Sequence, residues 1–91
     1  MDEKQEIMPH NIYIENRERI RITGVTDVGS FDEETLNIFT SFGELTVKGE
    51  NFQVTELSID KGELRVDGRI ISFMYSENTK KNGGFFARLL G

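Results

Sequence analysis

The stretch Gly43-Glu44-Leu45-Thr46-Val47-Lys48-Gly49 decides the fold class, because apolar Leu45 and Val47 alternate with polar neighbours between two glycines. A period of two places one row of side chains on a core face and the other row in solvent, as in a half-buried β-strand. The pattern recurs, at an offset of 19 residues, as Gly62-Glu63-Leu64-Arg65-Val66-Asp67-Gly68. We interpret the two copies as similar hairpin strands of one sheet.

A short β-solenoid is the alternative explanation of this repeat, because one solenoid coil takes a similar length of chain. Two copies are fewer than the three or so repeats that a solenoid needs for stability. The first third of the chain does not continue the period. We therefore keep the solenoid as the second interpretation.

Outward from this pair, alternating apolar residues extend from residue 11 to residue 76, and no segment fits the helical period of 3.6 well. Ile20 and Ile22, and later Leu36 and Ile38, alternate with polar neighbours in the same way. The pattern predicts about eight short strands. They lie near residues 11–15, 19–24, 27–31, 35–41, 44–48, 52–60, 63–67 and 69–76.

Turn-forming residues separate these runs. Gly and Asn tolerate positive φ, and an Asp side chain can bond to its own backbone. The predicted turns are Asn16–Arg17, Asp32–Glu33, Phe42–Gly43, Gly49–Glu50–Asn51, Asp60–Lys61–Gly62 and Asp67–Gly68. The last of these is the clearest two-residue hairpin signal.

The apolar parity changes once along the chain. Phe52 and Val54 occupy even positions, whereas Leu57 and Ile59 occupy odd ones. A β-bulge at Thr55–Glu56 would keep both halves facing the core. A turn between two shorter strands explains the change equally well.

The last predicted strand carries apolar residues on both faces, including Ile71, Phe73 and Tyr75. A strand of this kind is either central in its sheet or covered by a partner.

Length and composition indicate one small folded domain. The 91 residues suffice for one domain, whose core is thin because so short a chain buries only about two-thirds of its surface. The net charge of −5 argues against a nucleic-acid binder, which needs a clustered basic surface. The chain contains no cysteine, which excludes disulfides and thiolate metal sites. No signal-peptide pattern and no apolar run of about 18 residues occurs.

The organisation that we expect has four parts. Residues 1–9 are a flexible polar lead-in, residues 10–76 form the all-β domain, and residues 77–84 form a linker without apolar side chains. Residues 85–91 form an apolar tail.

A search for catalytic, cofactor or metal patterns predicts none of them, and we expect no enzyme. His10 is the single histidine and has no triad partners in sequence, so we interpret it as a surface residue. Asp32, Glu33 and Glu34 could attract a hard cation, but their spacing matches no calcium loop, and a solvated turn is the simpler interpretation.

Arg17, Arg19 and Arg21 alternate on one predicted strand, opposite Ile20 and Ile22. Three guanidinium groups on one face could dock an acidic partner surface. An ordinary exposed face, balanced by acidic neighbours, is the interpretation that we favour.

The tail is the strongest functional signal that the residues themselves provide. It contains four large apolar side chains in seven residues, namely Phe85, Phe86, Leu89 and Leu90. They could dock on another protein or fold back to cover this chain's own sheet, and we leave both interpretations open. A bilayer would bind so short a segment only weakly.

Several segments together resemble the YabP family of bacterial sporulation proteins, and its YqfC relatives less closely. The residues are Ile22-Thr23-Gly24-Val25-Thr26-Asp27-Val28-Gly29-Ser30-Phe31-Asp32, similar to the family's ITGV-x-x-V-x-SFD signature, and Gly43 to Asn51, similar to G-x-L-x-[IV]-x-G-x-[ND]. Further similarity includes Leu57 to Gly62, Val66 to Gly68, His10-Asn11 and Gly84 to Leu90. The resemblance covers about 80 residues, nearly the whole chain.

This resemblance implies a protein of the mother cell of an endospore former, present in the cytoplasm or at the forespore surface, with a part in spore cortex or coat assembly. The family has no known catalytic residues. Its members are encoded beside a membrane protein, YabQ, so the resemblance implies a partner of the YabQ type.

We therefore predict a single antiparallel β-sandwich or roll that acts by assembling with proteins, including copies of itself. The predicted docking residues are those of the tail together with Ile71, Phe73, Tyr75, Arg17, Arg19 and Arg21. The rival function is a small-ligand or cell-wall glycan-binding module, for which Tyr13 and Tyr75 are the only tyrosines available as an aromatic platform.

Overall fold

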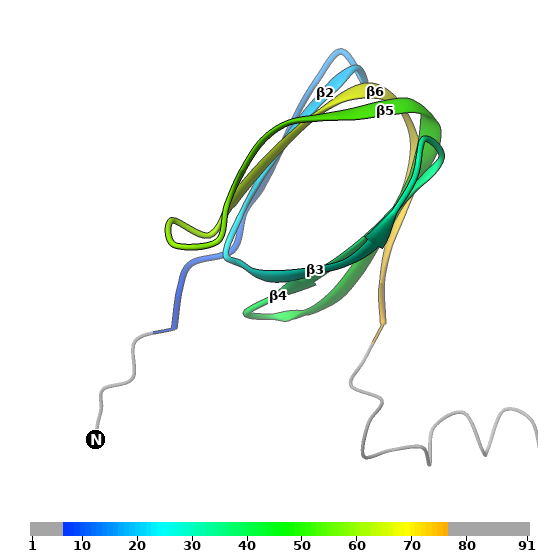
Figure 1. The fold of residues 1–91 in the computed structure, drawn as a ribbon. Coiled ribbons are helices and arrows are strands. Elements are labelled where there is room, and N and C mark those ends of the chain that lie inside the picture. The colour runs from blue at the N-terminus through cyan, green and yellow to red at the C-terminus, as the bar shows by residue number, and fades with distance from the viewer. Residues whose placement is uncertain (1–6, 77–91) are drawn as a thin grey trace, which may run out of the picture.

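The computed structural model describes residues 7–76, which form six β-strands and no helix (Figure 1). The strands are β1 (Ile12–Glu15), β2 (Arg19–Thr23), β3 (Val25–Phe31), β4 (Thr35–Thr40), β5 (Gly43–Ser58) and β6 (Glu63–Ser76). The all-β prediction is thus confirmed for this part of the chain. Within it, no helix is long and apolar enough to cross a membrane.

All six strands belong to one antiparallel sheet with the order β1-β2-β6-β5-β4-β3. Eight strands were expected because the turn-forming residues Gly49–Glu50–Asn51 and Asp67–Gly68 were each predicted to end a strand. Both predictions are wrong, because these residues lie inside β5 and β6, which are 16 and 14 residues long. The other four predicted turns do separate strands.

The turn-like residues bend the two long strands instead of ending them. The β5–β6 register shifts between Glu50 and Gln53, Asn51 has a φ of 57°, and Gly68 has a φ of 143°. A Cβ on Gly49 would collide with the carbonyl oxygen of Arg69 and with the ring of Phe52. Glycine is therefore needed at position 49 for close packing, which the sequence pattern alone did not distinguish from a turn.

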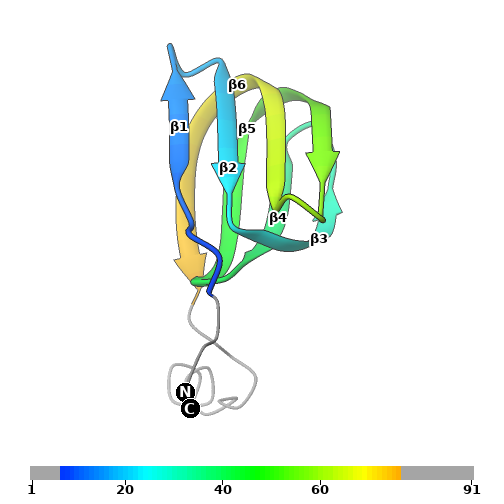
Figure 2. The ribbon, with the colours of Figure 1, turned by 90° about the vertical axis from the view of Figure 1, so that its left-hand side faces the viewer.

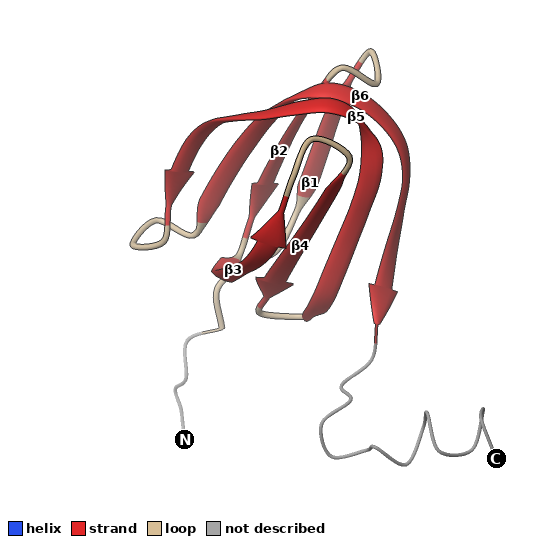
Figure 3. Cartoon of the chain, turned by 45° about the vertical axis from the view of Figure 1, so that its right-hand side comes forward, coloured by secondary structure: helices blue, strands red, loops and turns tan. Residues whose placement is uncertain are grey.

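The bends fold the single sheet over itself, so that two layers face each other (Figures 2 and 3). One layer contains β1, β2, the first half of β6 and the second half of β5. The other contains β3, β4, the first half of β5 and the second half of β6. A sandwich of two separate sheets is therefore not formed, and antiparallel pairing excludes the solenoid.

The core lies between the layers and is built from the inner row of each strand. Leu45 and Val47 are fully buried, as the alternation predicted, and so are Ile22 and Ile38. Burial of each such side chain stabilises the fold by about 1.5–3 kcal/mol. The remaining buried apolar residues are Ile20, Val25, Leu36, Phe52, Leu64, Val66 and Ile70.

The change of parity in β5 is a bulge, as one of the two sequence interpretations stated. The register with β6 shifts between Val54 and Glu56. Val54 pairs with buried Val66 and Leu57 pairs with buried Leu64, so both point to the inner face. Leu57 stays 45% exposed because it lies near the end of its layer.

Candidate functional site

The second half of β6, from Ser72 to Ser76, is the candidate interaction site. Its register with β5 pairs Phe73 with Val47 and Tyr75 with Leu45. Because directly paired residues of neighbouring strands share a face, Phe73 and Tyr75 point to the inner face. Both side chains are nevertheless 44% exposed.

This exposure follows from the position of the strand in its layer. The pairing of β6 with β2 stops at Asp67, and the backbone bonds from Gly68 and Ile70 to the β1–β2 turn extend it only to Ile70. Beyond that point, the described residues pair with β6 on the β5 side only. The end of β6 is thus a free edge within residues 7–76, and its inner-face side chains lie at an open side of the core.

The direction of the backbone groups along this edge follows from hydrogen bonds on the far side of β5. The N–H of Gly49 donates to the carbonyl of Glu34, away from β6, with a donor–acceptor distance of 3.0 Å. Because successive residues of a strand direct their polar groups to opposite edges, Lys48 and Thr46 bond toward β6. The opposing Ser72 and Met74 bond back to β5, so the N–H and C=O groups of Phe73 and Tyr75 face the free edge.

Tyr75 also holds the segment that precedes β1. The Nδ1 atom of His10 lies 2.8 Å from the carbonyl oxygen of Thr23, and its Nε2 atom lies 2.6 Å from the Tyr75 hydroxyl oxygen. A carbonyl only accepts, so Nδ1 donates and the hydroxyl can donate to Nε2. The imidazole also stacks with Phe42 at a centroid separation of 6.4 Å. His10 is therefore half-buried and bonded, and it is not a free surface histidine.

The arginines predicted on one strand face occupy two kinds of position. Arg17 lies in the β1–β2 turn with a φ of 57°, and its Nε donates to the carbonyl of Ile70 at 3.1 Å. Arg19 and Arg21 lie on the outer face of β2. Arg19 is 3.5 Å from Glu15, and Arg21 is 3.2 Å from Glu63.

Further carboxylates and one aromatic ring complete this outer face. Arg19 also lies 3.9 Å from Asp67, and Arg21 lies 4.3 Å above the ring of Tyr13. Arg65 pairs with Glu56 and with Glu63. Arg19 and Arg21 thus have acidic neighbours. This agrees with the sequence interpretation of an exposed face whose charges are balanced.

A hollow with a volume of about 520 Å³ lies along β1, β2 and β6, with Thr55 of β5 at its side. Its lining includes Tyr13, Arg21, Arg65 and Asp67. Tyr13 is on the outer face, whereas Tyr75 is on the inner face of the other layer. The two tyrosines consequently do not form one aromatic platform for a glycan.

The acidic turn after β3 has a backbone role. One carboxylate oxygen of Asp32 accepts hydrogen bonds from the N–H groups of Glu34 and Thr35, at 2.8 and 2.9 Å. The carbonyls of Glu33 and Glu34 accept from Phe52 and Gly49 at the bend of β5. No group of three His, Asp or Glu side chains in residues 7–76 is arranged to hold a metal ion.

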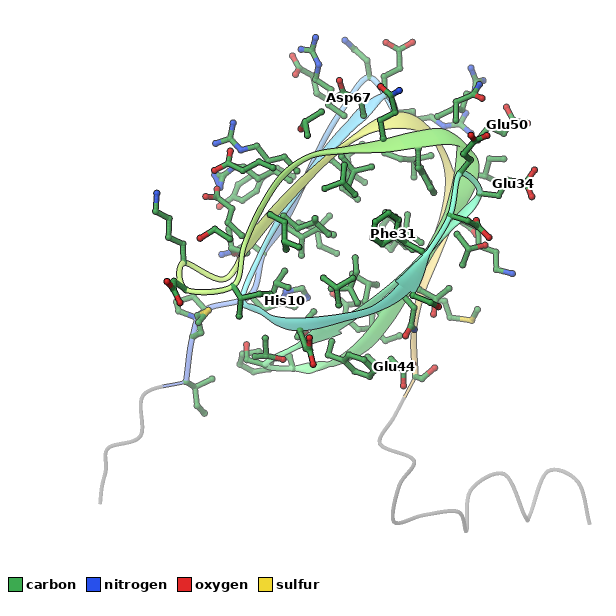
Figure 4. The ribbon with its side chains drawn as sticks, viewed as in Figure 1. His10, Phe31, Glu34, Glu44, Glu50 and Asp67 are labelled. Atoms are coloured by element: carbon green, nitrogen blue, oxygen red, sulfur yellow. The ribbon has the colours of Figure 1, made fainter. Side chains whose placement is uncertain are left out.

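Several exposed apolar residues were not selected from the sequence. Phe31 pairs with Leu36 and points inward, as Figure 4 shows, yet it remains 51% exposed. Met74 lies on the outer face and Phe42 in the β4–β5 turn, and both are exposed. Alternation showed which face Phe31 occupies but not that its layer ends there. The predicted tail anchors Phe85, Phe86, Leu89 and Leu90 lie outside the described residues.

The described chain is thus an all-β protein of a single folded-over sheet, with a free edge and exposed apolar side chains at an open side of its core. The chain belongs to the YabP family, which matches residues 6–82. It is 34% identical over 82 residues to the spore protein YabP of Bacillus subtilis (strain 168), an alignment that covers 88% of this chain and 82% of that protein. The resemblance stated from sequence motifs is confirmed, and the chain is a member of a sporulation protein family.

Proposed function

We propose that the protein is a non-enzymatic assembly component of the spore cortex or coat, made in the mother cell, that acts by binding other proteins. The observation that carries this proposal is the distribution of apolar side chains. Twelve large hydrophobic residues are exposed in the described chain, whereas the core contains eleven. Among these residues, Phe73 and Tyr75 lie on the same face at the open side of the core, and a contiguous exposed apolar patch is typical of an interaction site.

The comparisons support a role without catalysis. Neither the family description nor the name of the relative indicates a catalytic activity. The single histidine is engaged with Thr23 and Tyr75 in a structural contact. A binding and assembly role uses the free edge of β6 and the exposed apolar side chains beside it.

The proposed partner is a membrane protein of the YabQ type at the forespore surface. The tail residues Phe85, Phe86, Leu89 and Leu90 are the proposed anchors for this contact. An apolar segment of this kind binds a protein groove through a few large side chains.

A fluorescent fusion of the full chain in sporulating Bacillus subtilis tests this proposal. We expect a ring around the forespore. Changing Phe85, Phe86, Leu89 and Leu90 together to serine should make the signal diffuse in the mother cell, because the anchors are lost. A matched variant, Lys80→Gln with Lys81→Gln, should keep the ring.

A diffuse signal from the unaltered chain would contradict assembly at the forespore, and a ring that survives the serine variant would contradict the role of the tail. Co-purification with the YabQ-type protein, expressed together with either variant, separates loss of the partner from loss of localisation for another reason.

A further inference from the structure

The four free strand edges of the described chain differ in how they are protected against pairing. The edge strand β1 has only four residues and carries Glu15. The edge strand β3 carries Asp27 and two register shifts, and the second half of β5 carries Glu56 beside its bulge. Short strands, charges and bulges are the devices by which proteins block edge-to-edge association.

Within residues 72–76, the end of β6 carries neither a charge nor a bulge, and the nearest register shift lies just before it, at Ile71. Ser72, Phe73, Met74, Tyr75 and Ser76 pair with β5 in unbroken register and contain no charged residue and no proline. Two identical chains of net charge −5 can therefore pair along residues 72–76 without placing like charges directly opposite each other.

The hydrogen-bonding pattern of this edge is complementary to itself. The residues whose N–H and C=O groups face outward are Phe73 and Tyr75, on either side of Met74. A twofold axis through Met74 would place Phe73 of one copy opposite Tyr75 of the other, twice. Each such pair exchanges two backbone hydrogen bonds, so the contact would contain four.

The side chains around that axis also match. On the inner face, Phe73 would lie against Tyr75 of the second copy, and pairs of aromatic side chains stabilise neighbouring strands. On the outer face, Met74 would meet Met74 of the second copy, with serine on either side. Tyr75 keeps its contact with His10 of its own chain.

We propose that this edge binds a second copy of the same chain, with β6 paired antiparallel to β6 across a twofold axis at Met74. The pairing would join the two layers that contain β6, each of four strands, into one continuous layer of eight. The contact is small, and interfaces below about 1,200 Å² are usually weak, so we expect dissociation in the micromolar range. This inference does not depend on the role in sporulation.

Sedimentation equilibrium of the full chain over about 10–300 µM, the range that so small an interface implies, tests the dimer. Met74→Lys should leave a monomer, because two like charges would then lie directly opposite each other at the axis. Met74 is 58% exposed on the outer face, so thermal unfolding measured well below the dissociation constant, where both chains are monomeric, should be unchanged. An equimolar mixture of Met74→Lys and Met74→Glu should regain the dimer.

Thr46→Lys is the matched control, because Thr46 lies opposite Met74 on the same face, one strand further from the axis. The two introduced charges would be about 14 Å apart, three strand spacings, which is more than the screening length of about 8 Å in physiological salt. We expect this variant to dimerise as the unaltered chain does.

The absence of cysteine allows a direct test of the register. Residues opposite each other in a non-hydrogen-bonded pair have Cα atoms about 4.5 Å apart, within the range for a disulfide. Met74→Cys should therefore form a crosslinked dimer on mild oxidation, and Thr46→Cys should not.

Three outcomes would overturn the inference: a monomer at every concentration, a dimer that Met74→Lys leaves intact, or equal crosslinking at positions 46 and 74. A monomeric chain that still surrounds the forespore would overturn the dimer and leave the proposed function standing. A chain that dimerises but stays diffuse in the cell would support the dimer and contradict the proposed function.

Discussion

Gly49 and Gly29 are two glycines whose added Cβ would collide with very different atoms. At Gly49 the obstacles are the carbonyl oxygen of Arg69 and the ring of buried Phe52. At Gly29 the nearest atom is the side-chain amide oxygen of Asn37, which is half-buried and can rotate. Backbone and core atoms cannot move aside, whereas a side-chain end can.

We predict that Gly49→Ala lowers the free energy of unfolding by about 2–3 kcal/mol, the upper part of the range for overpacked sites. For a domain of this size, that corresponds to a fall of roughly 10 °C or more in Tm. Gly29→Ala should cost less than about 1 kcal/mol, because the Asn37 amide, which bonds to Glu44 and Thr46, and the exposed ring of Phe39 can both move aside. Thermal unfolding followed by circular dichroism measures both, and equal losses would contradict this account of the bend.

At the scale of an element, the bend in β5 depends on a residue in the left-handed region. Asn51 has a φ of 57° inside a strand that is otherwise extended, next to the register shift that folds the sheet. Asparagine tolerates this conformation better than other residues that have a Cβ, and glycine adopts it without cost.

We expect Asn51→Ala to lower the free energy of unfolding by about 1 kcal/mol, since a non-glycine residue in this region costs about 1–2 kcal/mol. Asn51→Gly should retain or increase stability, because the strain is relieved. Urea titration of the two variants beside the unaltered chain provides the measurement. If alanine were as stable as glycine at this position, the left-handed conformation could not be what bends β5.

The two long strands also determine how the whole molecule unfolds. Because β5 and β6 run through both layers, neither layer has a complete set of strands of its own. A molecule built in this way should lose both layers in a single cooperative transition.

Single tryptophan reporters test this cooperativity, since the chain contains no tryptophan. Tyr13→Trp reports on the layer of β1, and Phe39→Trp on the layer of β4. We predict denaturation midpoints that coincide within error, with equal dependence on denaturant. Two separated transitions would show that the layers are independent units.

Much of the sheet could be predicted from the residues because burial acts on each strand locally. The row of Ile20 and Ile22 and the row of Leu45 and Val47 had to face a core, and they do. The bulge near Thr55 was one of two interpretations, because only a change of parity signalled it. The predicted role of the tail stays a prediction, since those residues lie outside the described chain.

The sequence predictions failed on two features: the role of glycines inside long strands, and which strand edges are left without a paired strand. Gly49 and Gly68 looked like turn residues, because the sequence shows that a side chain is missing but not which atoms occupy its place. Phe73 and Tyr75 were selected for their apolar character, yet nothing in their order showed that their backbone groups would face a free edge.

By itself, the sequence determined that the protein is all-β, which side chains form the core, and to which family the chain belongs. Only the tertiary structure decided that eight expected strands are six, that one sheet folds over itself, and that the end of β6 is paired on one side only within residues 7–76. The physical reason is that side-chain alternation is a local property of each strand. Strand order, bends and free edges depend on backbone hydrogen bonds between residues far apart in the chain.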